Sequence, residues 1–376
     1  MGKIKVLNII SDTNIGGAGK CILTVGKHYD RDKFDLVVAV PKGSALKEEL
    51  EKIEVTCVEA EAIADESMSF AGISAQKKLI RGVKPDVVHT HAALSARIAA
   101  RLAGGCGIVY TRHCVYEPSA FMKSIVGKCI NQSVAALFSD KIIAVAEAAA
   151  ENLTDVGVPK SKIEVILNGI SPLSPLSNEE KEKQRKRFGV ADGQKVVSII
   201  ARLEEVKGHK YFIEAAQILK KRGINAKFIA AGKGTYEKTL FELAKNSSAD
   251  VLFSGFIEDP QNLVGITDVS VNASFGTEAT SISLLEGMSL GIPAVVSRYG
   301  GNPGVIFDGE NGLLFPVHDA EALADGIEKL LTDEHVYQKM SKRAKEVFYD
   351  TFTAEQMTKK TEEIYVALSK KHHKNK

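Results

Sequence analysis

Short apolar runs alternate with longer amphipathic segments along the first 170 residues or so of the chain. Apolar runs of four to six residues, bounded by turn residues, are typical of strands that are covered on both faces. The predicted strands are 5–10, 36–40, 55–58, 86–90, 108–111, 141–145 and 163–166. Helical patterns separate them, as at 94–103 and 146–155. This alternation predicts βαβ units and a parallel sheet with helices on both faces.

A second series of the same kind follows the Asn168-Gly169 turn. Its predicted strands are 195–200, 226–231, 251–253, 269–272 and 294–297. The Pro/Ser-rich stretch 171–178 between the two series is the best candidate for a hinge. The fold class is therefore α/β, with two Rossmann-like doubly wound domains facing each other across a cleft. Ligands are expected in that cleft, at the carboxyl ends of the strands.

The domain boundaries follow from the same pattern. We expect an N-terminal domain over residues 1–172 and a C-terminal domain over 173–351. The last amphipathic segment, about 352–370, is expected to be a helix that packs back on the N-terminal domain. A length of 376 residues suits two domains, because single cores stop growing at about 250–300 residues.

Composition and charge narrow the class of protein. A net charge of +2 gives no overall case for nucleic-acid binding. The five cysteines form no Cys-x-x-Cys pair, which indicates reduced thiols in a cytoplasmic compartment. The first apolar run is better interpreted as a strand than as a signal peptide, and no apolar stretch is long enough to span a membrane. We therefore expect a soluble cytoplasmic protein.

Two carboxylates stand out in the polar and glycine-rich stretch 272–316. Glu278 and Glu286 lie eight positions apart, so at about 100° per residue they would share one face of a helix. Gly276 and the polar run 277–283 surround the predicted start of that helix, where unpaired N–H groups can hold a phosphate. A carboxylate beside an anion site suits sugar hydroxyls. The stretch thus predicts a nucleotide-sugar site.

Cations and glycine turns follow the predicted strands of the second half. Arg202 and Lys207 flank the loop after 195–200, where two cations would neutralise a departing diphosphate. Ordinary surface charges are the alternative. Gly232 lies in a glycine turn after the next strand. Backbone groups around Phe256, in the loop that follows the third strand, would be able to contact the edge of a base.

The first half offers a glycine loop and, at or just after the ends of predicted strands, three histidines. Gly16 and Gly17 follow the first strand and allow a ligand to approach the backbone, although a plain strand-to-helix turn would also use them. His89 and His91 share one face of a strand end, but no third metal ligand is evident, and local hydrogen bonding is the preferred interpretation. His113 follows a later strand and would contact a sugar hydroxyl or a backbone carbonyl. A purely structural histidine is the alternative there.

The segment 92–141 is locally basic. Its bases are Arg97, Arg101, Arg112, Lys123, Lys128 and Lys141, and its acids are Glu117 and Asp140, so six minus two leaves an excess of four. Within it, 118–138 mixes charge with apolar residues such as Phe121 and Ile125. This part would lie against an anionic lipid surface or pack its apolar face inside the domain. Packing inside the domain is the preferred interpretation.

One Asp-x-Asp motif, a pattern that can carry a metal, occurs at Asp30 and Asp32. It falls between a helical segment and the strand 36–40, so we interpret it as a solvated turn. The sequence marks no metal site.

In their order and spacing these motifs resemble the retaining glycosyltransferases of the GT-B fold, in family 4 of the "group 1" transferases. The resemblance covers nearly the whole chain. It rests on the Gly16-Gly17 loop, His89–His91, His113, VILNGI, ARLEEVKG, AGKG, SGFIED, the two glutamates eight positions apart, GIPAVVSRYGG and DGENGLLFP.

The resemblance implies a role for each matching residue. Arg202 and Lys207 would bind the donor diphosphate, Glu278 the donor sugar and Glu286 the ribose. His113 would contact the 6-position of the sugar. Further substrate contacts are implied at Gly16, Gly17, Gly232, Phe256, Ile257, Ser281, Ile282 and Ser283. No protein nucleophile, metal or cofactor is implied.

Two departures from the family pattern concern the sugar pocket. Gly304 stands where many relatives have a glutamate, and Ala279-Thr280 replaces a frequent Gly-Phe or Gly-Leu. The donor sugar is therefore not predicted.

The function expected from all of this is transfer of a sugar from a nucleoside-diphosphate sugar, UDP favoured over GDP, to a lipid-linked or oligosaccharide acceptor. Bacterial surface polysaccharide is the expected product, made at the inner face of the plasma membrane. A hydrolysing UDP-sugar 2-epimerase and a non-catalytic nucleotide-sugar binder are the alternatives.

Overall fold

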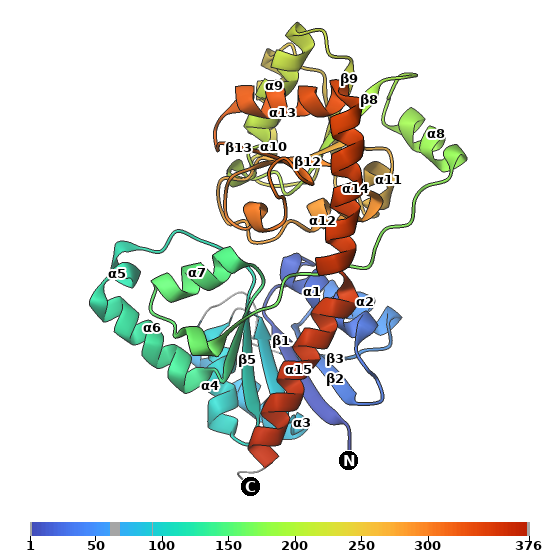
Figure 1. The fold of residues 1–376 in the computed structure, drawn as a ribbon. Coiled ribbons are helices and arrows are strands. Elements are labelled where there is room, and N and C mark those ends of the chain that lie inside the picture. Colours follow the sequence, from blue (N-terminus) through green and yellow to red (C-terminus); the bar gives the residue numbers. More distant parts are fainter. Residues whose placement is uncertain (1, 61–67, 92, 374–376) are drawn as a thin grey trace. The chain divides into compact units, whose positions relative to one another are not determined.

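The computed structural model describes residues 2–60, 68–91 and 93–373 (Figure 1). The chain divides into two compact units, one formed by Met1–Ser171 with Ala354–Lys376 and the other by Pro172–Thr353. Each unit has its own parallel sheet and its own apolar core.

The first unit is built on a seven-stranded sheet in the order β3-β2-β1-β4-β5-β6-β7, and every neighbouring pair is parallel. Its strands are β1 (Ile4–Ile10), β2 (Phe34–Pro41), β3 (Thr56–Ala60), β4 (Val87–His91), β5 (Gly107–Arg112), β6 (Lys141–Ala144) and β7 (Ile163–Val165). The central strands are almost wholly buried, as their continuous apolar runs predict.

Helices cover both faces of this sheet. They are α1 (Gly17–His28), α2 (Leu46–Lys52), α3 (Phe70–Val83), α4 (Leu94–Ala103), α5 (Ala120–Lys123), α6 (Ile125–Phe138), α7 (Glu147–Asp155), the 3₁₀ turn η1 (Lys160–Lys162) and α15 (Ala354–His373). One face packs against α1 and α15, through Ile22 and Tyr365, and the other against α3 and α4. The C-terminal helix is thus part of the core of the first unit.

The second unit has a six-stranded parallel sheet in the order β10-β9-β8-β11-β12-β13. Its strands are β8 (Lys195–Ile200), β9 (Ala226–Ala231), β10 (Val251–Gly255), β11 (Val269–Asn272), β12 (Ala294–Ser297) and β13 (Gly312–Phe315). Its helices are α8 (Asn178–Arg187), η2 (Glu205–Lys207), α9 (His209–Lys221), α10 (Glu237–Asn246), α11 (Gln261–Val264), α12 (Ile282–Leu290), η3 (Asn302–Gly304), α13 (Ala320–Thr332) and α14 (Glu334–Thr351).

The strand order places a switch point in each sheet. In the first unit it lies between β1 and β4, and in the second between β8 and β11, because the chain continues in opposite directions from these pairs. Loops diverge at the carboxyl ends of such strands, which leaves room for a ligand. In the second unit, the loops at this position carry Arg202 and Lys207 after β8 and Glu278 after β11.

Candidate active site

Glu278 and Glu286 do not share a helix face. The helix α12 begins only at Ile282, so Glu278 lies in the loop before it and the predicted pairing on one helix is wrong. Two residues explain the late start: Thr277 has a left-handed φ of 54°, and Ser281 is extended, with φ −77° and ψ 114°. Polar residues such as these favour turns and caps over helix interiors. Glu286 does lie on α12, and it is buried.

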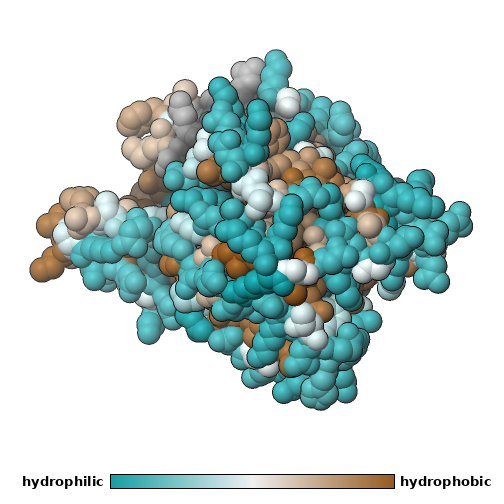
Figure 2. Space-filling view, turned by 90° about the horizontal axis from the view of Figure 1, so that it is seen from above, coloured by the Kyte–Doolittle hydropathy of each residue, from teal (hydrophilic) through white to brown (hydrophobic). Residues whose placement is uncertain are grey.

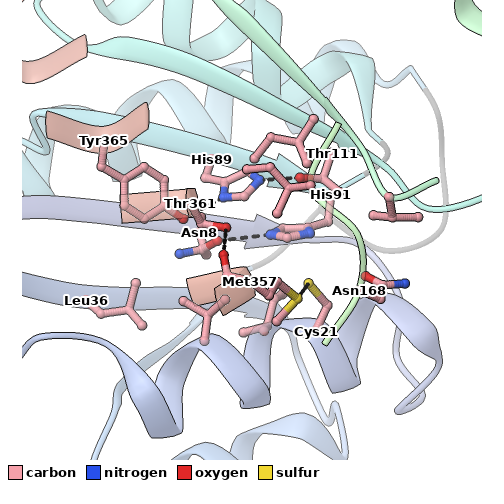
Figure 3. A pocket seen from close by; sticks show the side chains of 15 residues that line it. Asn8, Cys21, Leu36, His89, His91, Thr111, Asn168, Met357, Thr361 and Tyr365 are labelled. Atoms are coloured by element: carbon pink, nitrogen blue, oxygen red, sulfur yellow. Dashed lines mark hydrogen bonds between the residues drawn. The ribbon is translucent and has the colours of Figure 1, made fainter. Parts of the chain in front are cut away.

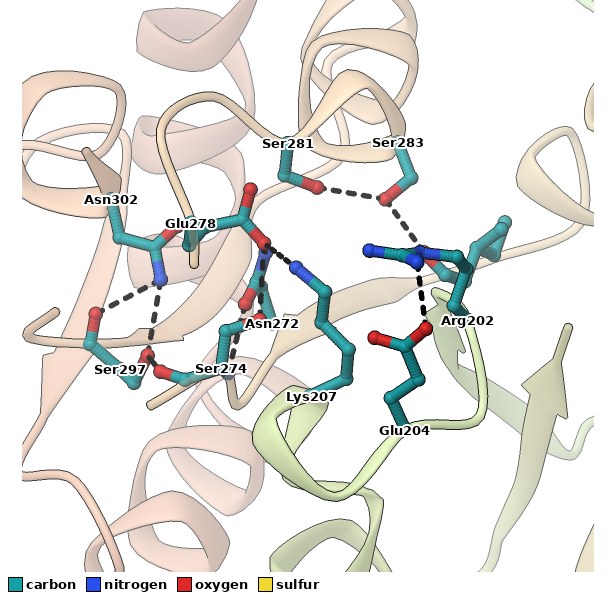
Figure 4. A network of polar contacts seen from close by, with 11 residues as sticks. Arg202, Glu204, Lys207, Asn272, Ser274, Glu278, Ser281, Ser283, Ser297 and Asn302 are labelled. Atoms are coloured by element: carbon teal, nitrogen blue, oxygen red, sulfur yellow. Dashed lines mark hydrogen bonds and ion pairs between the residues drawn. The ribbon is translucent and has the colours of Figure 1, made fainter. Parts of the chain in front are cut away.

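Glu278 forms a buried ion pair with Lys207. Its Oε2 atom is 3.0 Å from Lys207 Nζ and accepts hydrogen bonds from Ser274 Oγ at 3.0 Å and Asn272 Nδ2 at 3.4 Å (Figure 4). Lys207 and Glu278 are each only 8% exposed. A buried carboxylate needs such partners, because desolvation otherwise makes its charge very costly. These contacts all fall on Oε2, so they fix the direction of the carboxylate.

A close approach of two loops places Lys207 opposite Glu278. Gly208 follows the turn η2 and has a left-handed φ of 72°, and a Cβ atom built on it would lie 2.0 Å from the carbonyl oxygen of Ala273. Only glycine therefore fits between the loop after β8 and the loop after β11. The sequence motif around Lys207 is thus a packing requirement as well as a chemical one.

Arg202 lies on the same loop but in a different environment. Its Nη1 atom is 2.6 Å from Glu204 Oε1, and the side chain is 68% exposed. In Figure 4 the side chains of Arg202 and Lys207 point toward the same region, beside Ser281 and Ser283. Each of the two cations thus already has a carboxylate partner.

The first turn of α12 is tied to the end of β8. Ser283 Oγ donates a hydrogen bond of 3.0 Å to the carbonyl of Ile200, and the hydroxyls of Ser281 and Ser283 are 3.0 Å apart. In the described part of the chain, no side chain caps the N-terminus of α12 at Ser281. Its first N–H groups, including that of Ile282, have no partner within the helix and suit an anion.

A close backbone contact, which the sequence did not reveal, explains why residue 232 is a glycine. Its φ is 149°, and a Cβ atom there would lie 2.0 Å from the carbonyl oxygen of Ala201, so the loops after β8 and β9 touch through it. Its N–H donates to the carbonyl of Gly255 at 2.9 Å. In the following loop Phe256 is 69% exposed, whereas Ile257 packs against an apolar cluster. Phe256 is therefore the more accessible of the two predicted contacts.

In the first unit, His89 and His91 take part in local hydrogen bonds, as preferred from the sequence. His89 Nδ1 is 2.7 Å from the Tyr365 hydroxyl, and His89 Nε2 is 2.6 Å from Thr111 Oγ1. His91 Nε2 is 2.9 Å from Asn8 Oδ1 (Figure 3). Burial lowers the pKa of His89 to about 3 and also lowers that of His91, so both rings are neutral near pH 7.

His113 joins this group. Its Nε2 atom is 2.8 Å from His91 Nδ1, and burial, with a contribution from the nearby Arg112 charge, lowers its pKa to about 4. Its Nδ1 atom is buried and has no hydrogen-bond partner among the described residues. No backbone carbonyl of the described residues therefore pairs with His113 Nδ1. The contact with a sugar hydroxyl stays a prediction.

The predicted glycine loop leads directly into α1. Gly16 precedes the helix and Gly17 is its first residue, so both lie at a helix N-terminus next to the carboxyl end of β1. No side chain of the described residues caps this terminus.

Asp30 and Asp32 form a turn, as predicted. The Asp30 carboxylate accepts hydrogen bonds from the N–H groups of Asp32 and Lys33, at 3.0 and 3.2 Å, just before β2 begins. Across residues 2–60, 68–91 and 93–373, no group of three or more His, Cys, Asp and Glu side chains is placed to hold a metal ion.

The sequence did not identify four polar residues of these sites. Asn8 interrupts the apolar run of β1, and Asn272 and Ser274 stand at the end of β11; a polar side chain in or after a buried strand was the available signal. Tyr365 gave none, because it reaches His89 from a helix 276 positions away.

The outward face of α6 overturns the preferred interpretation of segment 118–138. Five of its large apolar side chains, on α5 and α6, are exposed and do not pack inside the domain: Phe121, Ile125, Val126, Ile130 and Leu137. Ile125 alone is 83% exposed. In Figure 2, brown atoms gather at the left edge of the molecule, on the side where Figure 1 shows α5 and α6. We call these five residues the α5–α6 patch. Among the helices described, none is sufficiently long and apolar to cross a membrane.

Two doubly wound units, one with a buried lysine–glutamate pair at its switch point, define a glycosyltransferase fold of the GT-B class. The chain belongs to the glycosyltransferases of group 1 and family 4: residues 180–347 match the family described as glycosyl transferases group 1, and residues 15–172 match Glycosyltransferase Family 4.

Similar proteins agree with this assignment. The chain is 31% identical over 275 residues to the "Putative glycosyltransferase EpsD" of Bacillus subtilis (strain 168), covering 70% of this chain and 72% of that protein. It is 24% identical to the UDP-Gal:alpha-D-GlcNAc-diphosphoundecaprenol alpha-1,3-galactosyltransferase of Escherichia coli, covering 88% and 89%. The crystal structure of Anabaena Alr3699/HepE in complex with UDP has a TM-score of 0.82 at 22% identity, covering 97% and 100%.

Proposed function

We propose that this glycosyltransferase acts with retention, without a metal or other cofactor, and takes its sugar from a nucleoside-diphosphate sugar, UDP favoured over GDP. The acceptor is a lipid-linked saccharide or an oligosaccharide. The observation that carries the proposal is the buried Lys207–Glu278 pair, with Arg202 pointing toward the same region next to the uncapped start of α12.

The chemistry follows from where charge develops. As the bond to the sugar breaks, negative charge builds on the diphosphate, and Lys207, Arg202 and the N–H groups at 281–283 stabilise it. The diphosphate takes over part of the contact that each cation now makes with a carboxylate. Glu278 then keeps Ser274 and Asn272 as partners on Oε2 and accepts a sugar hydroxyl on Oε1. Glu286 is assigned to the ribose hydroxyls, and no carboxylate is assigned as a nucleophile.

The relatives support the choice of donor and acceptor. The Escherichia coli relative is named for a UDP-galactose donor and a diphosphoundecaprenol-linked acceptor, and the Anabaena structure holds UDP. We extend both features to this protein, and with them a place in bacterial surface polysaccharide synthesis at the inner face of the plasma membrane.

Incubating the purified protein with UDP- and GDP-sugars and cell-envelope lipid extracts is expected to release UDP only when an acceptor is present. UDP alone should raise the melting temperature, because a ligand at 100 times its Kd stabilises the folded state by about 2.7 kcal/mol. A free epimerised sugar formed without acceptor would show the epimerase instead. A melting-temperature shift without any turnover would show a silent binder.

We further propose that the α5–α6 patch rests on an anionic lipid surface, where a lipid-linked acceptor would be found. On α6 the outward positions Ile125, Val126, Ile130 and Leu137 are apolar, which is the reverse of an ordinary surface helix. The exposed Lys128 flanks this face, and Lys123 stands on α5 beside it, paired with Glu117. An apolar face rimmed by lysines is typical of interfacial helices.

Replacing Ile130 with glutamate should weaken binding to vesicles that contain an anionic phospholipid by about tenfold or more, because burying one such side chain contributes about 1.5–3 kcal/mol. Co-sedimentation at low and high salt measures this. Gln132→Glu is the matched control, since it adds the same charge at an exposed polar position of the same helix. Equal binding of both variants would refute the lipid contact, and concentration-dependent dimers abolished by Ile130→Glu would assign the patch to a second copy of the chain.

A further inference from the structure

The two ring nitrogens of His113 have different surroundings. Nε2 contacts His91, whereas Nδ1 is buried without a partner among the described residues. A buried polar atom left unpaired costs about 1–3 kcal/mol, so a hydroxyl or water is expected to reach it in the working enzyme. Whether Nδ1 donates or accepts in that contact depends on which nitrogen carries the proton.

The hydrogen-bond partners around His113 determine which of its ring nitrogens carries the proton. The carbonyl oxygen of the Asn8 side chain can only accept, so His91 Nε2, at 2.9 Å, carries the proton and donates it. Burial raises the pKa of Tyr365, and the neighbouring Asn8 side chain opposes that rise.

The position of the proton on His91 in turn determines its position on His113. His91 is neutral, so with Nε2 protonated its Nδ1 atom has a lone pair and accepts. His113 Nε2, at 2.8 Å, must therefore donate. Because His113 is also neutral, its own Nδ1 atom is left as a hydrogen-bond acceptor.

We propose that Asn8 and His91 are positioning residues that hold His113 in the Nε2–H tautomer, so that its Nδ1 atom accepts a hydrogen bond from a hydroxyl of the bound sugar. The tautomer rests on the contacts within the first unit alone; the sugar as hydrogen-bond donor rests on the proposed function. An acceptor of this kind selects for a hydroxyl, since a deoxy sugar would leave the buried nitrogen unpaired.

The tautomer is measured directly by long-range ¹H–¹⁵N correlation spectra of the full-length protein labelled only at histidine. The chain has nine histidines, and His113→Gln assigns the relevant signal. At pH 7 the ligand-free protein should show His113 protonated at Nε2 and unprotonated at Nδ1. The opposite pattern, or a mixture of the two, would overturn the proposal whatever the enzyme transfers.

Asn8→Asp should reverse the pattern. A carboxylate at this position favours a doubly protonated His91, which would donate from Nδ1 and drive the proton of His113 to its own Nδ1. Thr111→Val is the matched control, because it removes a hydrogen bond of His89 in the same pocket and leaves the Asn8–His91–His113 contacts in place. An unchanged His113 tautomer in a folded Asn8→Asp protein would contradict the proposed relay.

A second readout tests the sugar contact. Asn8→Asp should lower kcat/KM by about tenfold for the normal donor and much less for the deoxy donor that lacks the contacted hydroxyl, since losing one buried hydrogen bond costs about 1–3 kcal/mol. An equal loss across a panel of deoxy donors would refute the sugar contact while the spectra still decide the tautomer. A wild-type protein with no turnover would refute the proposed function and leave the spectral test intact.

Discussion

Replacing Lys207 with alanine is expected to lower kcat by about 10²–10³, the size seen when an enzyme loses one electrostatic stabiliser of a developing charge. Lys207 is buried and its ammonium group is fixed by Glu278, so it needs little rearrangement when the diphosphate departs. Steady-state kinetics with a saturating donor measure the effect. Lys210→Ala is the control, because Lys210 is an exposed lysine on the adjacent helix α9 that pairs with Glu214.

The same substitution also acts on folding, and the two effects can be separated. Removing one member of a buried ion pair leaves the other charge uncompensated and typically costs 3–5 kcal/mol, whereas removing both is often nearly neutral. The double variant Lys207→Met/Glu278→Gln should therefore regain most of the melting temperature that Lys207→Met loses, but none of its activity. Recovery of activity together with stability would show that Lys207 has only a structural role.

Strand positions were the most predictable part of the fold. The predicted ranges 195–200, 226–231, 269–272 and 294–297 coincide with β8, β9, β11 and β12, because a continuous apolar run between turn residues has few alternatives in a sheet covered on both faces. The edge strand β13 is not among the predicted strands. It has only four residues, Gly312–Phe315, and the local pattern there resembles a loop.

The site was less predictable, since its key contacts join distant parts of the chain. Lys207 and Glu278 are separated by 71 positions, and no local sequence pattern around either residue predicts that they pair. The helix argument for Glu278 and Glu286 failed because a period of 3.6 holds only inside a helix, and the backbone leaves it between Thr277 and Ser281.

The sequence also could not predict in which direction the apolar face of α6 points. The apolar positions of α6 repeat as they would on a buried helix, and only the packed structure shows that Ile125 and Ile130 point outward. Periodicity identifies an apolar face, but it does not say whether protein or another phase covers it.

Gly208→Ala is expected to destabilise the second unit strongly. A residue with a Cβ atom in the left-handed region costs about 1–2 kcal/mol, and here the added atom would lie 2.0 Å from the Ala273 carbonyl oxygen, so the two loops must move apart. We expect a total of about 3–5 kcal/mol. At about 2–4 °C per kcal/mol, the transition of the second unit should shift down by roughly 6–20 °C.

The control for Gly208→Ala lies at the other end of the same helix. Gly223 follows α9 with a φ of 80°, and a Cβ atom there would meet nothing within 4 Å. Gly223→Ala therefore has the same backbone cost without the clash and should lower the melting temperature by only a few degrees. Gly208→Ala should also reduce kcat, because moving the loop after β8 away from Ala273 draws Lys207 from Glu278. If thermal unfolding shifts the two variants equally, the close approach of the loops contributes nothing, and the placement of Lys207 must have another cause.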